Sequence, residues 1–236
     1  MSTTTRILQT VAALAACAAL AAPASAQYYS HDHALRFRAG LFEPDGNSQY
    51  WYDASDLFTG SGPSDFQDTI GGVDYRMGLG GGNHLSLLFS ASGYEGQSHR
   101  TYRDFVDNRG NEIRSRATLD ISSLTAGLMF QFAPQAPVRP YVGAGGGYYF
   151  WQLKESGDFI DFGASNTVFH DRFKDDGQTL GYYWLAGLAV PLSPDWSLFA
   201  EGRWHNADDT LSGDFAGLGK LDLSGREISA GFAWSF

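Results

Sequence analysis

Apolar and polar residues alternate one by one along eight stretches of the chain. In the first stretch Leu35, Phe37 and Ala39 are separated by Arg36 and Arg38. The others lie at about 73–79, 84–92, 117–132, 142–150, 180–190, 196–205 and 227–236. A period of two predicts β-strands with two unlike faces.

One stretch changes phase in its middle. Ala117, Leu119 and Ile121 are apolar at odd positions, whereas Ala126 and Leu128 are apolar at even positions. A β-bulge shifts side chains to the opposite face, so the shift predicts a bulge near Ser122-Ser123.

The connections between the stretches alternate in length. Long ones cover roughly 43–67, 95–114, 154–178 and 206–223, and short ones cover 80–83, 133–138 and 192–195. This alternation is typical of a transmembrane barrel, which has short periplasmic turns and long external loops. The sequence therefore predicts an all-β fold, an eight-stranded antiparallel up-and-down transmembrane β-barrel, with both termini on the periplasmic side.

The first 26 residues have the features of a secretory signal peptide. Arg6 precedes the apolar, alanine-rich residues 7–22, and Ala24-Ser25-Ala26 provides a cleavage site. Leu14-Ala15-Ala16-Cys17 resembles a lipobox, but cleavage there would split the apolar region. We expect a signal peptide at 1–26 and a barrel domain at 27–236.

Charged residues in the strands fall on the polar face. The predicted interior set contains five arginines and four carboxylates: Arg36, Arg38, Asp74, Arg76, Arg116, Asp120, Glu201, Arg203 and Glu227. The alternative is a soluble barrel whose polar face is outside. Near balance of charge favours an interior position, because buried charges require partners.

The opposite face carries many aromatic residues near the predicted strand ends. The four tryptophans on it are Trp184, Trp196, Trp204 and Trp234. Aromatic girdles of this kind lie at membrane interfaces. In water the same face would be an apolar surface of a size that soluble monomers avoid.

Composition and charge exclude other classes of protein. Hydrophobic residues make up 43% of the chain and charged residues only 18%, which argues against disorder. The net charge of −10 argues against a nucleic-acid partner, which needs a basic face. The four long connections hold 19 of the 26 acidic residues and 8 of the 16 basic ones, so the acidity belongs to the predicted external loops.

Three segments resemble the eight-stranded outer-membrane β-barrels of Gram-negative bacteria, the OmpA/OmpX/opacity-protein type. They are Pro140–Tyr148, Pro191–Trp204 and the terminal Trp234-Ser235-Phe236. The resemblance implies outer-membrane lipid as surroundings. It also implies that Phe236 is recognised by the barrel-assembly machinery, with periplasmic chaperones as partners during biogenesis.

Some eight-stranded barrels of this membrane modify lipid A. The segment around His205 resembles the lipid A 3-O-deacylase type, but Ala207 stands where the nucleophilic serine would be. Ser212 and Asp208 or Asp209 are near His205 in sequence only, and a Ser–His–acid set needs all three within reach.

No metal or cofactor site is predicted. His31-Asp32-His33 offers two ligands, too few for a closed site. Asp175-Asp176-Gly177 and Asp208-Asp209 lack the spacing of a calcium loop. We therefore expect a non-enzymatic structural or surface-interaction protein with an unidentified loop ligand. A small channel and a lipid A-modifying enzyme are the alternatives.

A short element recurs in three long connections. It is Ser64-Asp65-Phe66, Gly157-Asp158-Phe159 and Gly213-Asp214-Phe215. Its phenylalanine either anchors the connection on the barrel or forms a partner-binding tip, and we favour the anchor.

Overall fold

The computed structural model describes residues 32–80, 84–163 and 167–236. The predicted signal peptide, the cleavage site and Cys17 of the lipobox-like segment lie outside these residues, as does His31. No helix in the described ranges is both long and apolar enough to cross a membrane.

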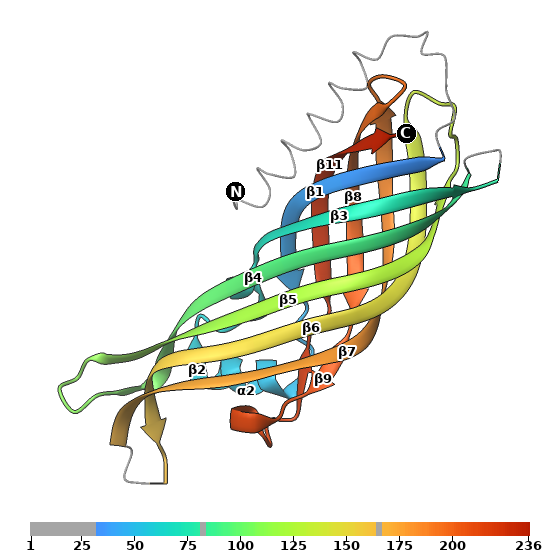
Figure 1. Cartoon of the computed structure of the whole chain (residues 1–236). Helices are drawn as coiled ribbons and strands as arrows, with labels where there is room; N and C mark the ends of the chain where they lie inside the picture. Colours follow the sequence, from blue (N-terminus) through green and yellow to red (C-terminus); the bar gives the residue numbers. More distant parts are fainter. Residues whose placement is uncertain (1–31, 81–83, 164–166) are drawn as a thin grey trace.

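Eight antiparallel strands form a closed ring (Figure 1). They are β1 (His33–Pro44), β3 (Asp68–Leu79), β4 (Leu85–Val106), β5 (Glu112–Gln131), β6 (Arg139–Asp161), β7 (Thr167–Pro191), β8 (Trp196–Asn206) and β11 (Gly225–Ser235). Each strand pairs with the next in sequence, and β11 pairs with β1 to close the ring. The predicted barrel class is confirmed, and each of the eight alternating stretches lies in one strand of the ring.

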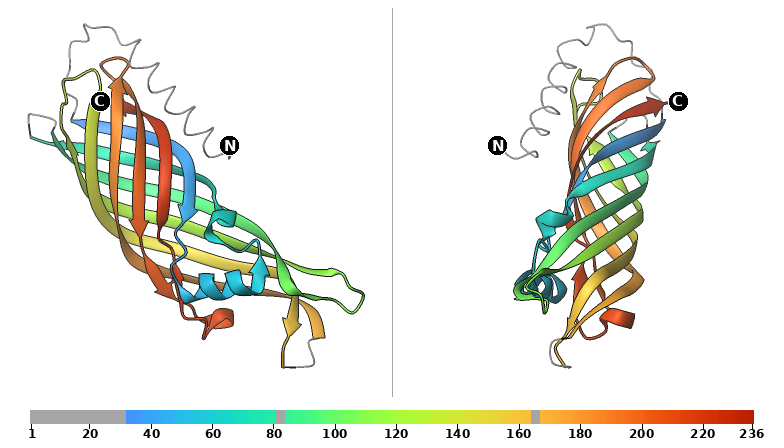
Figure 2. Two further views of the ribbon diagram at one scale, coloured as in Figure 1. Left: turned by 180° about the vertical axis from the view of Figure 1, so that it is seen from behind. Right: turned by 90° about the vertical axis from the view of Figure 1, so that its left-hand side faces the viewer.

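The two ends of the barrel differ in construction. At the end with short connections, which we call the turn end, the C-terminal Phe236 follows β11. At the opposite end β4 to β7 continue well past the other strands, and we call this the extended end (Figure 2). Two of the predicted long loops are therefore mostly strand, a correction to the expectation for 95–114 and 154–178.

The other two long connections contain short elements at the extended end. Between β1 and β3 lie α2 (Gln49–Leu57), β2 (Phe58–Thr59) and the 3-10 turn η1 (Pro63–Phe66). Between β8 and β11 lie β9 (Asp208–Thr210), η2 (Gly213–Phe215) and β10 (Lys220–Asp222). Strand β2 adds to β4, and β9 pairs with β10 as a separate hairpin.

The bulge expected near Ser122-Ser123 is absent from β5. Residues 115–130 pair one for one with both β4 and β6 without a shift of register. Ala117, Leu119 and Ile121 point inward and are buried, and Ser123 and Thr125 point inward on the same face. Odd-numbered residues therefore face inward along the whole of this strand. What changes along its length is whether the inward and outward residues are apolar or polar.

This exchange divides the barrel into two zones. Near the turn end the outward residues are apolar, such as Leu87 and Phe89 on β4, and the inward ones combine polar side chains, such as Ser90, with a smaller apolar cluster that includes Leu88. Beyond Gly93 the outward residues of β4 are Glu95, Gln97 and His99, and the inward Tyr94 is buried. The first zone has apolar side chains outside, as a lipid belt requires, and we call it the apolar zone. The second zone has the apolar interior of a water-soluble protein.

The second zone has a hydrophobic core of its own. It contains residues of the strands and of the covering segments: Phe42, Tyr50, Trp51, Phe66, Ile70, Tyr94, Ala117, Leu119, Ile121, Tyr149, Trp151, Leu153, Ala207, Leu211, Phe215, Leu221 and Leu223. We call this set the extended-end core. Phe66 and Phe215 belong to it, and Phe159 is buried nearby. The three Ser/Gly-Asp-Phe elements therefore place their aromatic ring inward, as predicted for an anchor.

Candidate functional site

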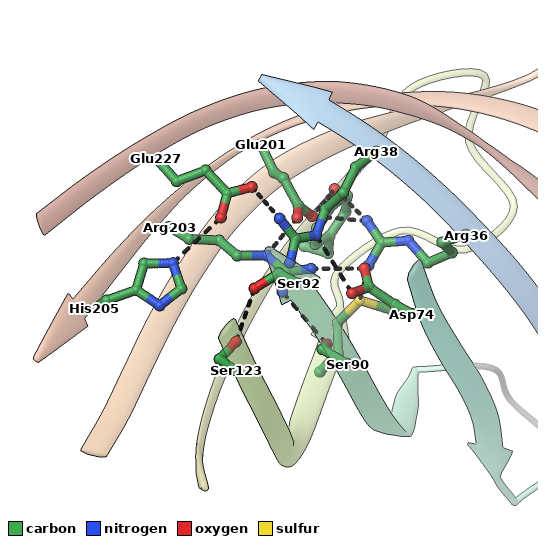
Figure 3. A network of polar contacts seen from close by, with 12 residues as sticks. Arg36, Arg38, Asp74, Ser90, Ser92, Ser123, Glu201, Arg203, His205 and Glu227 are labelled. Atoms are coloured by element: carbon green, nitrogen blue, oxygen red, sulfur yellow. Dashed lines mark hydrogen bonds and ion pairs between the residues drawn. The ribbon is translucent and has the colours of Figure 1, made fainter. Parts of the chain in front are cut away.

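Six charged side chains meet inside the apolar zone of the barrel (Figure 3). They are the arginines Arg36, Arg38 and Arg203 and the carboxylates Asp74, Glu201 and Glu227, and none is more than 5% exposed. We call this set the lumen network. β1 contributes two of its arginines, β8 one arginine and one carboxylate, and β3 and β11 one carboxylate each.

Asp74 is the centre of the network. Its Oδ2 lies 2.6 Å from Nη2 of Arg203 and 3.5 Å from Nη1 of Arg36. Its Oδ1 lies 3.4 Å from Nε of Arg38. One carboxylate therefore contacts all three guanidinium groups, which could not remain so close together without it.

Glu201 and Glu227 neutralise the other sides of the same arginines. Glu201 lies 2.6 Å from Nε of Arg203 and 2.7 Å from Nη2 of Arg36, and it accepts a hydrogen bond from the Tyr141 hydroxyl. Glu227 pairs with Arg38. Three positive and three negative groups balance, so the set carries no net charge in the low-dielectric interior.

A glycine beside the network leaves room for the Arg38 side chain. A Cβ atom at Gly72 would lie 2.7 Å from the guanidinium carbon of Arg38. An eight-stranded barrel has an interior only wide enough for side chains. The network therefore occupies the cross-section of the lumen.

The three other residues predicted for the interior do not belong to the lumen network. Arg76 lies on the inward face of β3, where it lines a cavity of about 50 Å³ at the turn end together with Arg36 and Arg139. Arg116 and Asp120 lie on the outward face of β5 beyond the apolar zone, where Asp120 pairs with Lys154 at 3.1 Å. Their assignment to the interior was wrong, because the assumed bulge reversed their face.

His205 extends the network toward the extended-end core. It is 7% exposed, its Nε2 lies 3.2 Å from Glu227, and its Nδ1 lies 3.1 Å from the Tyr149 hydroxyl. Ser212 donates to Asp175 instead, and Asp208 pairs with Lys220. The residues considered for a Ser–His–acid set are each bonded elsewhere in this structure.

The remaining acidic pairs and His33 also have protein partners. Asp175 accepts from Ser212, Asp209 accepts from Trp151, and His33 contacts the Tyr75 hydroxyl at 2.7 Å. Within the described residues no group of three or more His, Cys, Asp or Glu side chains has the arrangement of a metal site.

The outward tryptophans form two clusters. Trp196, the first residue of β8, pairs in register with Trp234, whose ring lies 5.0 Å from that of Phe236. Trp204, two residues before the end of β8, stacks on Trp184 of β7 with ring centroids 3.8 Å apart. The clusters therefore lie at the two ends of the apolar zone.

The fold agrees with the comparisons to known proteins. No curated protein matches the chain in sequence. Among solved structures, OprG of Pseudomonas aeruginosa is 12% identical with a TM-score of 0.52, covering 89% of this chain and 97% of that one. A major outer membrane protein of Thermus thermophilus is 11% identical with a TM-score of 0.50, covering 88% of this chain and 100% of that one.

Similarity at this level of identity shows the fold alone, but a family model extends the conclusion. The model of the outer membrane protein beta-barrel domain matches residues 12–236, which is almost the whole chain. The protein therefore belongs to the outer membrane protein beta-barrel domain family and resides in the bacterial outer membrane.

Proposed function

We propose that the protein is a non-enzymatic anchor that holds a folded, acidic surface at the outside of the cell for interaction with other molecules. The observation that carries this proposal is the lumen network, whose six buried charges occupy the barrel cross-section. A barrel with a filled interior is suited to support rather than to transport.

The extended end is the surface that we assign to the outside. Barrels of this membrane have short periplasmic turns and long external segments. The four connections at the extended end hold 19 of the 26 acidic residues. The extended-end core packs the segments between β1 and β3 and between β8 and β11 against the strands, so the described part of these two connections is folded.

Lipid is the partner of the apolar zone. Outward residues such as Leu87, Phe89 and Leu128 are partly or largely exposed in the isolated chain, and a lipid belt removes them from water. We place Trp184 and Trp204 at one membrane interface and Trp196 and Trp234 at the other, in keeping with their positions on β7, β8 and β11.

Ion conductance tests this proposal against a small channel. We expect planar bilayers containing the protein to show no steady conductance above the lipid baseline, because the buried side chains of the lumen network lie across an interior that is only wide enough for side chains. Conductance steps that change when Arg38 or Arg76 is replaced by alanine would instead support the channel.

The lipid A-modifying alternative has a separate measurement. We expect overexpression to leave the mass profile of lipid A unchanged, because both ring nitrogens of His205 are bonded to residues other than a serine, namely Tyr149 and Glu227. A changed profile that returns to normal in His205→Ala would overturn the non-enzymatic assignment.

Phe236 is proposed as the signal read by the barrel-assembly machinery. It lies outward beside Trp234 at the turn end, 46% exposed, so its loss leaves the buried networks intact. We expect Phe236→Ala to lower the amount of heat-modifiable barrel in the outer membrane several-fold, with periplasmic chaperones retaining the unassembled chain.

The matched control for Phe236 is Phe232→Ala, an outward phenylalanine of the same strand with 43% exposure. Both purified variants should refold in detergent to the same extent. Equal amounts of assembled Phe236→Ala and Phe232→Ala protein in cells would contradict a signalling role for the terminal residue.

A further inference from the structure

A cavity at the extended end lies beneath α2. It measures about 250 Å³, and its walls come from α2, β2, β4, β6, β7 and the segment that contains η2. Single-ring compounds fit a space of this size, which is below the usual range for drug-sized ligands. We call this space the α2 cavity.

Six of its thirteen lining residues are aromatic. They are Tyr50, Phe58, Tyr102, Phe159, Phe173 and Phe215. Ring faces bind apolar groups, and they also attract organic cations through the negative charge of their π-systems.

One polar side chain of the wall has a donor without an acceptor. Arg100 is 1% exposed, and its Nε has no hydrogen-bond partner among the described residues. Its Nη2 lies 2.7 Å from Oε1 of Glu155, and its guanidinium carbon lies 4.7 Å from the centre of the Phe58 ring. This nitrogen has almost no surface open to the cavity, so Arg100 is a closed polar part of the wall and not a contact point for a ligand.

The charge of Arg100 itself is already compensated. The Tyr50 hydroxyl donates to the same Oε1 of Glu155, at 2.7 Å. Burial by itself lowers the pKa of Arg100, but Tyr50 and Glu155 offset this and raise it, so the guanidinium stays charged. Burial and the neighbouring Glu155 raise the pKa of Tyr50, which stays neutral.

Two exposed carboxylates lie at the rim of the α2 cavity. Asp53 comes from α2, where it accepts a hydrogen bond from Gln49, and Asp214 comes from η2, where it accepts one from the Lys174 backbone. With Glu155 they give three carboxylates against one guanidinium in the lining. The cavity therefore disfavours anions and favours a cation at its entrance.

We propose that the α2 cavity binds a small arylalkyl ammonium compound. The ring lies between the aromatic side chains of the wall, and the ammonium group lies beside Asp53 and Asp214. This inference deepens the proposed surface interaction by naming a ligand class, and it rests on the extended end facing outward.

Calorimetric titration of the protein, extracted from outer membranes in a nonionic detergent, tests the proposal with three matched probes. Tyramine has the ammonium group, tyrosol replaces it by a neutral hydroxyl, and 3-(4-hydroxyphenyl)propionate replaces it by an anion. We expect saturable binding of tyramine, about tenfold weaker binding of tyrosol, and no binding of the propionate. Empty micelles measure partition into detergent.

Variants test the position of the ammonium group. The double variant Asp53→Asn/Asp214→Asn should bind tyramine at least about fivefold more weakly, whereas Asp56→Asn, an exposed change on the same helix outside the lining, should not alter it.

Three results would overturn the proposal: no saturable binding of tyramine, equal binding of the propionate, or unchanged binding by the double aspartate variant. Each leaves the anchor function standing if the bilayer recordings show no conductance. Conductance with intact tyramine binding would overturn the anchor function and keep the ligand site.

Discussion

Asp74→Ala is expected to destabilise the protein by about 3–5 kcal/mol, the cost of leaving a buried ion-pair network without one partner. Asp74 is fully buried and contacts Arg36, Arg38 and Arg203. Its removal leaves three guanidinium groups against two carboxylates in the buried interior. Equilibrium urea unfolding of the protein in lipid vesicles measures this loss.

Asp120→Ala is the matched control for this measurement. Asp120 also pairs with a cation, Lys154, but both side chains are partly exposed on the outward face. An exposed pair contributes about 0–1 kcal/mol, so this variant should unfold close to wild type. Similar losses for the two aspartates would show that the lumen network has no special role in stability.

Trp51→Ala is expected to weaken the extended-end core by about 3–5 kcal/mol, the usual cost of removing a large buried aromatic side chain. Trp51 is 1% exposed, contacts Phe66 edge to face, and donates its indole N–H to the backbone carbonyl of Asp222. It therefore joins α2 to η1 and β10. Hydrogen exchange measured by mass spectrometry should become at least about a hundredfold faster in α2.

The effect should be local, because the lipid belt and the lumen network lie in the other zone. Strands β1 and β11 should keep their protection from exchange in Trp51→Ala. Tyr52→Ala is the control on the same helix, since Tyr52 is 57% exposed, and it should change stability by no more than about 0.5 kcal/mol. Unchanged exchange in α2 of Trp51→Ala would contradict a packed external core.

Much of the fold could be predicted from the sequence. Strict alternation in stretches such as 35–41 and 227–236 indicates strands with two unlike faces, because successive side chains point to opposite sides. Placing Arg36, Arg38, Glu201 and Arg203 on the polar face required only this period. The alternation of short and long connections indicated the topology of the barrel.

Which residues of distant strands come together in a site was harder to predict from the sequence. Arg100 and Glu155 fall in two segments that the sequence suggested were loops, and they meet only because β4 and β6 continue beyond the apolar zone. A signal for this was present in Tyr94, Ser98, Arg100 and Tyr102, which continue the inward parity of β4. Because these inward residues include aromatic, polar and charged side chains, the alternation of apolar and polar residues is not visible there.

Alternation and connection lengths were enough to predict the number of strands in the ring and their order. Which face of each strand lies inside along its whole length depends on the folded structure. In β5 the apolar residues change from odd to even positions. Either a β-bulge or a change from water to lipid outside the strand would explain this change. The unbroken pairing with β4 and β6 excludes the bulge. A strand has lipid outside it in one zone and water outside it in the next, so the same outward direction selects apolar residues in the first zone and polar residues in the second.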